Sequence, residues 1–148
     1  MATTSPSAVP ELASRLRFAV TRTARRLRQE AAPAGLSPTL TAALATVDRL
    51  GPLTPSELAA AERIQRPTAT RILARLEADG LLERAADPAD RRSWLVSATP
   101  TGRALLHEVR TRKEAFLAER LAALEAADLA ALERAATVLE RLLAEDGR

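Results

Sequence analysis

Apolar residues recur at helical spacing over most of the chain, and prolines and glycines separate the helical stretches. Large apolar side chains return every three or four positions over about residues 10–30, which predicts a first helix. Ser37 followed by Pro38 has the composition of a helix start, because serine caps and proline suits the first helical position. A second helix is therefore predicted from Pro38 to about Leu50, where a glycine and a proline follow.

Two shorter helices are predicted next. Thr54 and Glu57 have the spacing of a capping box, in which hydroxyl and carboxylate each accept a backbone amide. This start predicts a helix over Pro55–Glu62, and a further helix is predicted over about Pro67–Asp79, with Gly80 as its C-terminal signal. The last of these helices has an apolar arc formed by Ala69, Ile72, Leu73 and Leu76. Its opposite arc is small or basic and consists of Pro67, Thr70, Arg71, Ala74 and Arg75.

The only strand-like stretch lies between residues 81 and 98. Leu81–Arg84 is a short run, and residues 94–98 alternate with a period of two. The polar segment Asp87–Arg92 between them has the composition of a turn. The pattern predicts a small antiparallel hairpin with a charged tip, in which Trp94 is the packing anchor.

Two more helices are predicted after the hairpin. Thr99 and Pro100 repeat the cap-and-proline signal at the start of a long helix, and Asp128 has the position of a cap for a last helix. Both helices carry more large apolar side chains than is expected of helices that lie outside a compact domain. They are expected to pack against a second copy of the chain, and an intramolecular helical hairpin is the alternative.

Composition narrows the function classes. The 148 residues include no cysteine and one histidine, His107, which excludes disulfides, thiol chemistry and histidine-rich metal sites. Catalytic triads, phosphate-binding loops and metal-ligand spacings are missing, so we expect neither an enzyme nor a cofactor. No apolar run approaches the ~18 residues of a membrane span. The first ten residues lack the pattern of a signal peptide, and a cytoplasmic location is expected.

Basic residues concentrate in the first two-thirds of the chain, although the formal net charge is only +3. Residues 11–30 contain six arginines and two glutamates, and residues 66–76 contain three arginines and no acid. Lys113 is the one lysine, and arginine suits the recognition of phosphates and bases. A coding bias toward alanine, arginine and leucine would give the same usage.

Two short helices that are joined by a tight turn and followed by a hairpin describe a winged helix-turn-helix. The second helix of such a pair can lie in the DNA major groove. Open amides at its start favour a phosphate or an acceptor-rich base edge, and Gln65, Arg66 and Thr68 lie there. Thr70 and Ala74 are small enough to let the backbone approach, so that the arginines on this arc reach guanine edges or phosphates.

Plainer interpretations exist for each of these features. Arg71 and Arg75 could form a solvated face paired with Glu77 or Asp79. The hairpin tip could be an ordinary polar turn with local ion pairs. It is the occurrence of all the features in one order and spacing that favours nucleic-acid binding.

Over about residues 12–143 the chain resembles the multiple antibiotic resistance regulator (MarR) family of bacterial transcription factors. Two stretches carry the resemblance. Residues 58–84 are similar to the family's recognition helix running into its wing, and Asp87–Gly102 is similar to the wing signature and the start of the next helix. Ala89 departs from the pattern, because the family's wing often has an arginine there.

The resemblance implies a homodimer that binds a palindromic operator in double-stranded DNA and acts as a repressor. It places a flexible tail at residues 1–10, a dimerisation helix at 11–35, the winged DNA-binding domain at 36–99 and C-terminal dimerisation helices at 100–148. Carried over by position, the groove-facing residues are Thr68, Thr70, Arg71 and Arg75. Arg92 matches the wing arginine that enters the minor groove, with Arg91 beside it, and Asp90 matches the acid that orients the tip.

The resemblance also implies control by a ligand, because family members often release DNA when a small, frequently aromatic acid binds beside the winged domain. No motif locates such a pocket. Arg17, Arg22 and Arg26 could attract an anion, and a solvated helix face is the plainer alternative. A DNA-binding protein without ligand control and a winged-helix protein-interaction module remain alternatives, and the basic outer face argues against the second.

Overall fold

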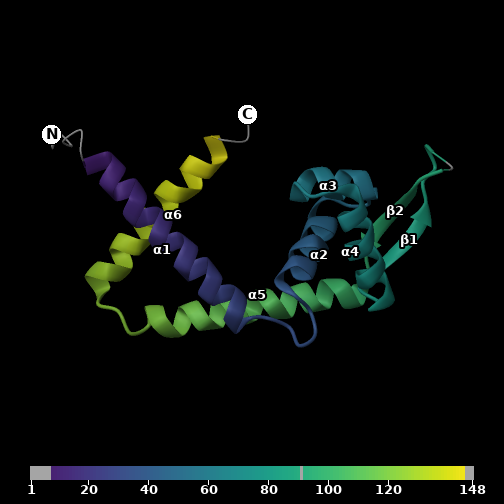
Figure 1. Ribbon diagram of the computed structural model, residues 1–148. Helices are drawn as coiled ribbons and strands as arrows, with labels where there is room; N and C mark the ends of the chain where they lie inside the picture. Colours follow the sequence, from purple (N-terminus) through teal and green to yellow (C-terminus); the bar gives the residue numbers. More distant parts are fainter. Residues whose placement is uncertain (1–7, 91, 146–148) are drawn as a thin grey trace. The chain divides into compact units, whose positions relative to one another are not determined.

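The computed structural model describes residues 8–90 and 92–145, and it consists of helices and one small sheet (Figure 1). The chain divides after Lys113 into two compact units, and the boundary falls inside the fifth helix. The elements in chain order are α1 (Ala8–Glu30), α2 (Pro38–Leu50), α3 (Pro55–Glu62), α4 (Arg66–Ala78), β1 (Leu82–Ala86), β2 (Trp94–Ala98), α5 (Pro100–Leu121) and α6 (Ala126–Glu145). The predicted fold class, mainly helical with a small β-hairpin, is confirmed.

Local sequence explains where the helices of the first unit begin. The Ser37 hydroxyl accepts the Leu40 amide at 3.3 Å, at the start of α2. At the start of α3, the Thr54 hydroxyl accepts the Glu57 amide at 3.3 Å, and Glu57 Oε2 accepts the Thr54 amide at 2.7 Å. The predicted capping box is therefore complete. Its hydrogen bonds, from the Thr54 backbone and then from the Thr54 side chain, hold the pKa of the Glu57 carboxyl below its ordinary value.

Two helix starts differ from the prediction. Residues 8–10 of the expected N-terminal tail belong to α1, and the rest of that tail, residues 1–7, lies outside the described residues. Asp128 is not the cap of α6, because two alanines with high helix propensity extend the helix to Ala126. Asp128 lies in the first turn, where its carboxylate still favours the positive end of the helix dipole.

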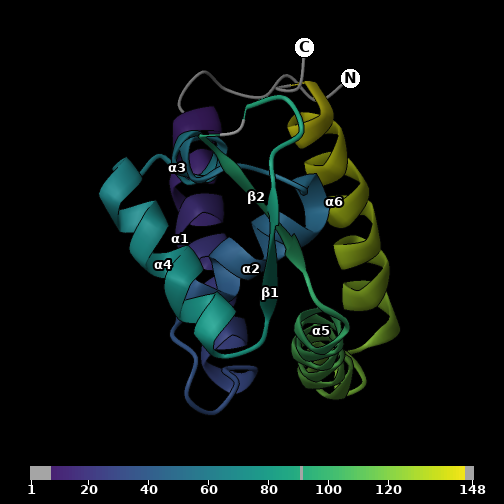
Figure 2. The same cartoon turned by 90° about the vertical axis from the view of Figure 1, so that its right-hand side faces the viewer.

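The hairpin pairs β1 and β2 in antiparallel register (Figure 2). Leu82 lies opposite Ala98, Arg84 opposite Val96 and Ala86 opposite Trp94. β1 therefore ends two residues nearer the tip of the hairpin than predicted, because its length is set by pairing with β2. Leu53 forms a β-bridge with Val96 along the edge of β2 that is not paired with β1. The Leu53 amide donates to the Val96 carbonyl at 3.2 Å, and the Leu53 carbonyl accepts the Val96 amide at 2.9 Å.

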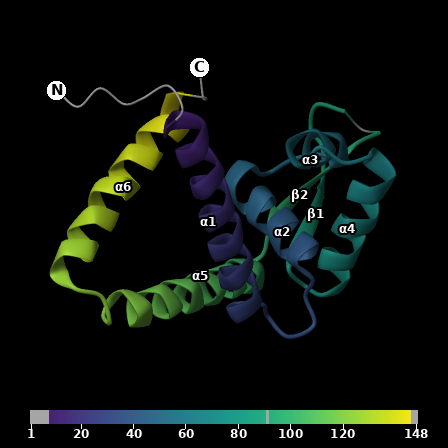
Figure 3. The ribbon, with the colours of Figure 1, turned by 60° about the vertical axis from the view of Figure 1, so that its left-hand side comes forward.

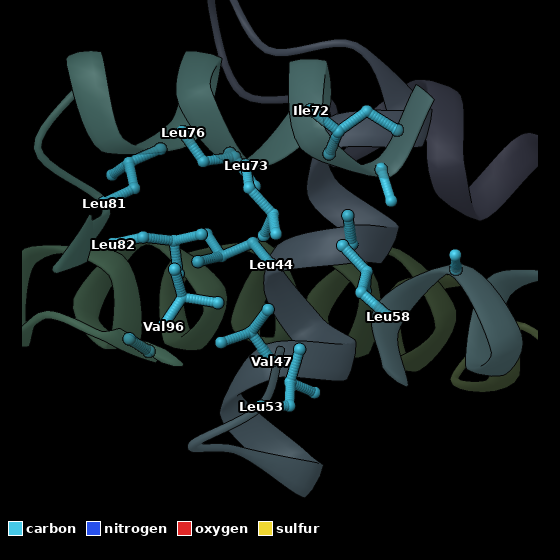
Figure 4. Close-up of a cluster of buried hydrophobic side chains, with 14 residues drawn as sticks. Leu44, Val47, Leu53, Leu58, Ile72, Leu73, Leu76, Leu81, Leu82 and Val96 are labelled. Atoms are coloured by element: carbon cyan, nitrogen blue, oxygen red, sulfur yellow. The ribbon is translucent and has the colours of Figure 1, made fainter. Parts of the chain in front are cut away.

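One aliphatic core joins α2, α3, α4 and the hairpin (Figures 3 and 4). Leu105 and Leu106 of α5 pack against the same cluster. With aromatic residues at 2% of the chain, the core is built from leucine, valine, isoleucine and alanine. Its largest fully buried side chains are Leu44, Val47, Leu58, Leu73, Leu76 and Val96.

The start of α5 is fastened to the base of the hairpin by Thr99 and Gly102. The Thr99 hydroxyl donates to the Gly80 carbonyl at 2.7 Å and accepts the Gly102 amide at 3.0 Å. A Cβ atom on Gly102 would lie 2.3 Å from the Leu81 carbonyl oxygen, so glycine is required at this crossing. The predicted cap is confirmed, and the spacing of Thr99 and Gly102 has a structural reason.

Among the described residues, none of the helices has the length and apolar character needed to cross a membrane.

Candidate nucleic-acid interface

α4 is held to the core by one face and presents the other to solvent. Its predicted apolar arc is buried, with Ala69, Leu73 and Leu76 fully inaccessible and Ile72 at 8% exposure. The helix ends in a Schellman turn at Gly80, which has φ 72°. There the Gly80 amide donates to the Glu77 carbonyl and the amide of the next residue donates to the Leu76 carbonyl, each at 2.9 Å. The C-terminal end of the helix is thus fixed, and the outer arc is left uncovered by its own chain.

The predicted site residues of the helix gather on this outer arc. Thr68 is half-buried, and the exposed members are Gln65, Arg66, Thr70, Arg71 and Arg75. Gln65 is the N-cap residue, and its side chain makes no cap hydrogen bond. The first turn of α4 contains no acidic residue. The open amides and the absent acid give this end of the helix an unopposed positive partial charge.

The two outer arginines of α4 are paired differently. Arg75 Nε lies 2.9 Å from Asp79 Oδ2, so the plainer alternative, pairing within the helix, is the observed arrangement for Arg75. Arg71 Nη2 donates to the Thr68 hydroxyl at 3.4 Å, and no carboxylate of the described chain forms an ion pair with it. Arg71 therefore carries the less compensated charge on this face.

Hydrogen bonds at the hairpin tip define a turn that two aspartates stabilise. Asp87 Oδ1 accepts the Ala89 amide at 2.8 Å, and Asp90 Oδ1 accepts the Arg92 amide at 2.9 Å. The Asp90 carbonyl also accepts the Ser93 amide at 2.9 Å. Asp90 is therefore a turn-forming residue, and the Arg92 side chain is exposed beside it. The predicted site residue Arg91 lies outside the described residues.

Arg84 is a residue of this surface that sequence reasoning did not single out. Its Nη2 lies 2.7 Å from Glu77 Oε2 of α4, and its guanidinium carbon lies 3.7 Å from the centroid of the Trp94 ring. A signal was present in the alternation of β1. Arg84 has the same parity as the buried Leu82, so it is expected on the inner face of the hairpin.

A pocket of about 570 Å³ lies in the first unit, lined by residues of α1, α2, α3 and α5 and of the loop after α1. Its apolar lining includes Ala31, Leu36 and Val109, and two acids, Asp48 and Glu62, also line it. The Glu62 carboxylate accepts a hydrogen bond from the buried Thr46 hydroxyl. Its basic lining consists of Arg28, Arg49, Arg110 and Lys113.

The arginines that the sequence suggested as anion attractors do not line this pocket. Of the arginines on α1, Arg28 in the last turn is the one that lines the pocket. Sequence reasoning missed the basic residues of the pocket because they come from three separate helices, α1, α2 and α5. Only the fold brings them together.

Comparison with known proteins identifies the family. The MarR family model matches residues 36–94. An HTH-type transcriptional regulator of Mycobacterium tuberculosis is 37% identical over 134 residues, which are 90% of this chain and 94% of the relative. The chain belongs to the MarR family. MarR proteins are DNA-binding transcription regulators with a winged helix-turn-helix, and the family is not one of enzymes.

Solved structures of MarR-like regulators agree with this assignment. A Pseudomonas aeruginosa protein, described as a candidate transcriptional regulator, is 37% identical and has a TM-score of 0.82, with 95% of this chain and 98% of that chain covered. The Multiple Antibiotic Resistance Repressor, MarR, is 25% identical with a TM-score of 0.71, with 93% and 95% covered. The similarity extends beyond the winged domain to nearly the whole chain.

Proposed function

We propose that this MarR protein is a repressor that binds a palindromic operator as a homodimer. In this proposal residues 36–99 form the DNA-binding domain, α4 lies in the major groove and the hairpin is a wing that enters the minor groove. The observation that carries the proposal is the outer arc of α4, which is exposed, free of acids in its first turn and basic. As a regulator of bacterial genes, the protein would act in the cytoplasm.

Chemistry assigns different roles to the residues of the outer arc. The open amides at Arg66 and Thr68 suit a phosphate, and the exposed Gln65 and Arg66 side chains suit the flanking backbone. Thr70 donates its hydroxyl proton to the Arg66 carbonyl at 3.0 Å and so presents a small surface for close approach. Arg71 is proposed to read a guanine edge, because its guanidinium is exposed and not ion-paired. Arg75 would first have to leave Asp79.

The wing is proposed to contribute positive charge to the minor groove. The exposed Arg92 side chain lies at the turn that Asp90 stabilises. Arg91 belongs to the same proposal by its place in the sequence. Ala89 removes one contact that the family's wing often makes, so the minor-groove contribution rests on these two arginines.

Exposed apolar side chains on both terminal segments support the homodimer. A second copy of this chain is the natural occupant, because the helices of residues 11–35 and 100–148 would each meet their own counterparts under twofold symmetry. On α1 the exposed apolar residues are Val9, Leu12, Leu16, Phe18 and Val20. At the other end they are Leu121, Leu124, Leu129, Leu132, Val138, Leu142 and Leu143.

The pocket supports release of DNA by a small effector. The lining combines apolar residues with two threonines, four basic side chains and two carboxylates, which suits an aromatic or other apolar molecule with an anionic group. The repressor role is supported by the name of the similar Multiple Antibiotic Resistance Repressor. Binding of DNA without ligand control is the alternative.

Selection of bound sites from random DNA duplexes tests the proposed function. We expect a palindrome whose half-sites are about one helical turn, ~34–36 Å, apart, because two α4 helices of a symmetric dimer reach successive major grooves. Log affinity should fall linearly with log salt concentration as phosphate contacts release counterions. Failure to enrich any sequence would favour the protein-interaction module instead.

Arg71 variants on the selected operator test the assigned readout. Arg71→Ala should cost about 1–3 kcal/mol of binding free energy and relax preference at one base pair per half-site. Arg71→Lys keeps the charge and loses the planar fork, so it should keep the salt dependence and lose the preference. If Arg71→Lys retains the full preference, Arg71 contacts phosphate and does not read a base.

A further inference from the structure

Arg84 occupies a position where the hairpin leaves the core. On the inner face of the hairpin, Leu82 and Ala98 are buried opposite each other, and the next pair along is Arg84 and Val96. Val96 is fully buried, whereas the Arg84 side chain is 41% exposed. A guanidinium thus stands at the edge of the core, where the strand alternation would otherwise place an apolar residue.

Two contacts compensate the charge of Arg84 and join three elements. The Arg84 Nη2 atom pairs with Glu77 Oε2 of α4 at 2.7 Å. The Trp94 ring of β2 lies 3.7 Å from the guanidinium carbon. Arginine alone among the basic residues can stack and form a directed ion pair at once. Among the described residues, this is the one ion pair between α4 and the hairpin.

The part of the hairpin beyond Arg84 has little other support. Beyond the Arg84–Val96 pair, the strands form two more pairs, Ala85 with Leu95 and Ala86 with Trp94. Figure 1 shows this end of the hairpin projecting past α4. A two-stranded ribbon is marginally stable by itself, so its direction depends on what fastens its base. The Arg84 contacts provide this fastening on the side of α4.

We propose that Arg84 is a positioning residue for DNA binding. Held by Glu77 and Trp94, it sets the direction of the wing relative to α4, so that Arg92 and the outer arc of α4 meet one duplex together. Arg84 itself then contributes no direct DNA contact. This inference rests on the proposed role of the wing in the function above.

Glu77→Gln in the full-length protein tests the inference by the sign of its effect. The variant removes a negative charge beside the DNA-binding surface, so electrostatics alone would raise affinity. Loss of the ion pair instead frees the wing, and we expect affinity for the selected operator to fall by about three- to tenfold. The matched control is Glu83→Gln on β1, which removes the same charge from the outer face of the strand, opposite Ser97. The control should leave affinity unchanged or raise it.

The combination with Arg92→Ala shows whether the effect passes through the wing tip. In the Arg92→Ala background, Glu77→Gln and Arg84→Gln should cause a smaller loss than in the wild type, because Arg91 is then the remaining wing arginine. A Glu77→Gln affinity equal to or above that of the control, or an undiminished loss in the Arg92→Ala background, overturns the positioning role. An Arg92→Ala variant with wild-type affinity, by contrast, contradicts the proposed function of the wing.

Trp94 provides a readout in the absence of DNA, because it is the single tryptophan of the chain. In Glu77→Gln the Trp94 ring should lose its contact with the Arg84 guanidinium, so acrylamide should quench its fluorescence more strongly. In Glu83→Gln the quenching should match that of the wild type. Arg84→Lys should lie between the wild type and Arg84→Gln in both quenching and affinity. Unchanged quenching in Glu77→Gln overturns the inference even if affinity falls.

Discussion

Arg71 and Arg75 lie one turn apart on α4, and within the described chain only the charge of Arg75 is compensated by an ion pair. Asp79 holds Arg75 at 2.9 Å, whereas Arg71 has only a 3.4 Å hydrogen bond to the Thr68 hydroxyl. The sequence placed both on the outer arc, because helical periodicity is local. It could not say which arginine is paired or that Glu77 turns toward Arg84, because these choices depend on the position of the hairpin.

The Thr54 cap allows a test at the residue scale. Thr54→Ala should lower the free energy of unfolding at pH 7 by about 0.5–2 kcal/mol, because the Glu57 amide loses its acceptor. Ser56→Ala in the same first turn is the matched control and should cost less. Urea denaturation followed by circular dichroism measures both.

The pH dependence of the same variant follows from Glu57. Its carboxyl has a lowered pKa in the folded protein, so the stabilisation is fully present above the ordinary carboxyl pKa. It is lost as the pH falls through the lowered value. The stability difference between Thr54→Ala and the wild type should therefore shrink in acid, and a difference that grows in acid would contradict the assigned box.

At the scale of elements, helix boundaries that caps and prolines determine could be predicted from the sequence. Boundaries that depend on pairing with another element could not. The bounds of α3 follow from Thr54 and the proline after it. The extent of β1 depends on β2, and two alanines before Asp128 moved the start of α6. The pocket was beyond prediction for the same reason, because its lining comes from separate elements.

An arginine of α5 tests the pocket. Benzoate, as a small aromatic acid, should weaken operator binding by the wild-type protein, and Arg110→Gln should require about tenfold more benzoate, because it loses one charge-assisted contact. Arg112→Gln is the matched control, since Arg112 pairs with Glu108 and does not line the pocket. Fluorescence anisotropy of labelled operator gives the measurement. Equal responses of the two variants would remove the pocket from the regulatory proposal.

At the scale of the whole molecule, the winged domain has a core of its own, whereas apolar side chains of α1 and α6 remain exposed. Leu142 and Leu143 are 54% and 74% exposed, and Phe18 is 57% exposed. Helical periodicity predicted these apolar faces from the sequence. It could not decide between an internal hairpin and a second copy, because that choice depends on surfaces far apart in the chain. The exposed faces favour the second copy.

Removal of residues 128–148 tests the assembly. Sedimentation of the wild-type protein should give a dimer, and the truncated protein should sediment as a monomer, because the exposed apolar face of α6 needs a partner. Leu132→Glu, which keeps the helix intact, should weaken the dimer, and Glu133→Gln at the adjacent exposed position should not. A truncated protein that still dimerises would place the interface elsewhere.

Gly102 has a mechanical consequence. The backbone of α5 meets the Leu81 carbonyl so closely that no side chain fits between them, and Thr99 ties the same crossing to the end of α4. Because this contact is so close, a tilt of α5 at the crossing would also move Leu81 and the start of the wing. Gly102→Ala would place a methyl group against the Leu81 carbonyl and change the angle at which the wing leaves the domain.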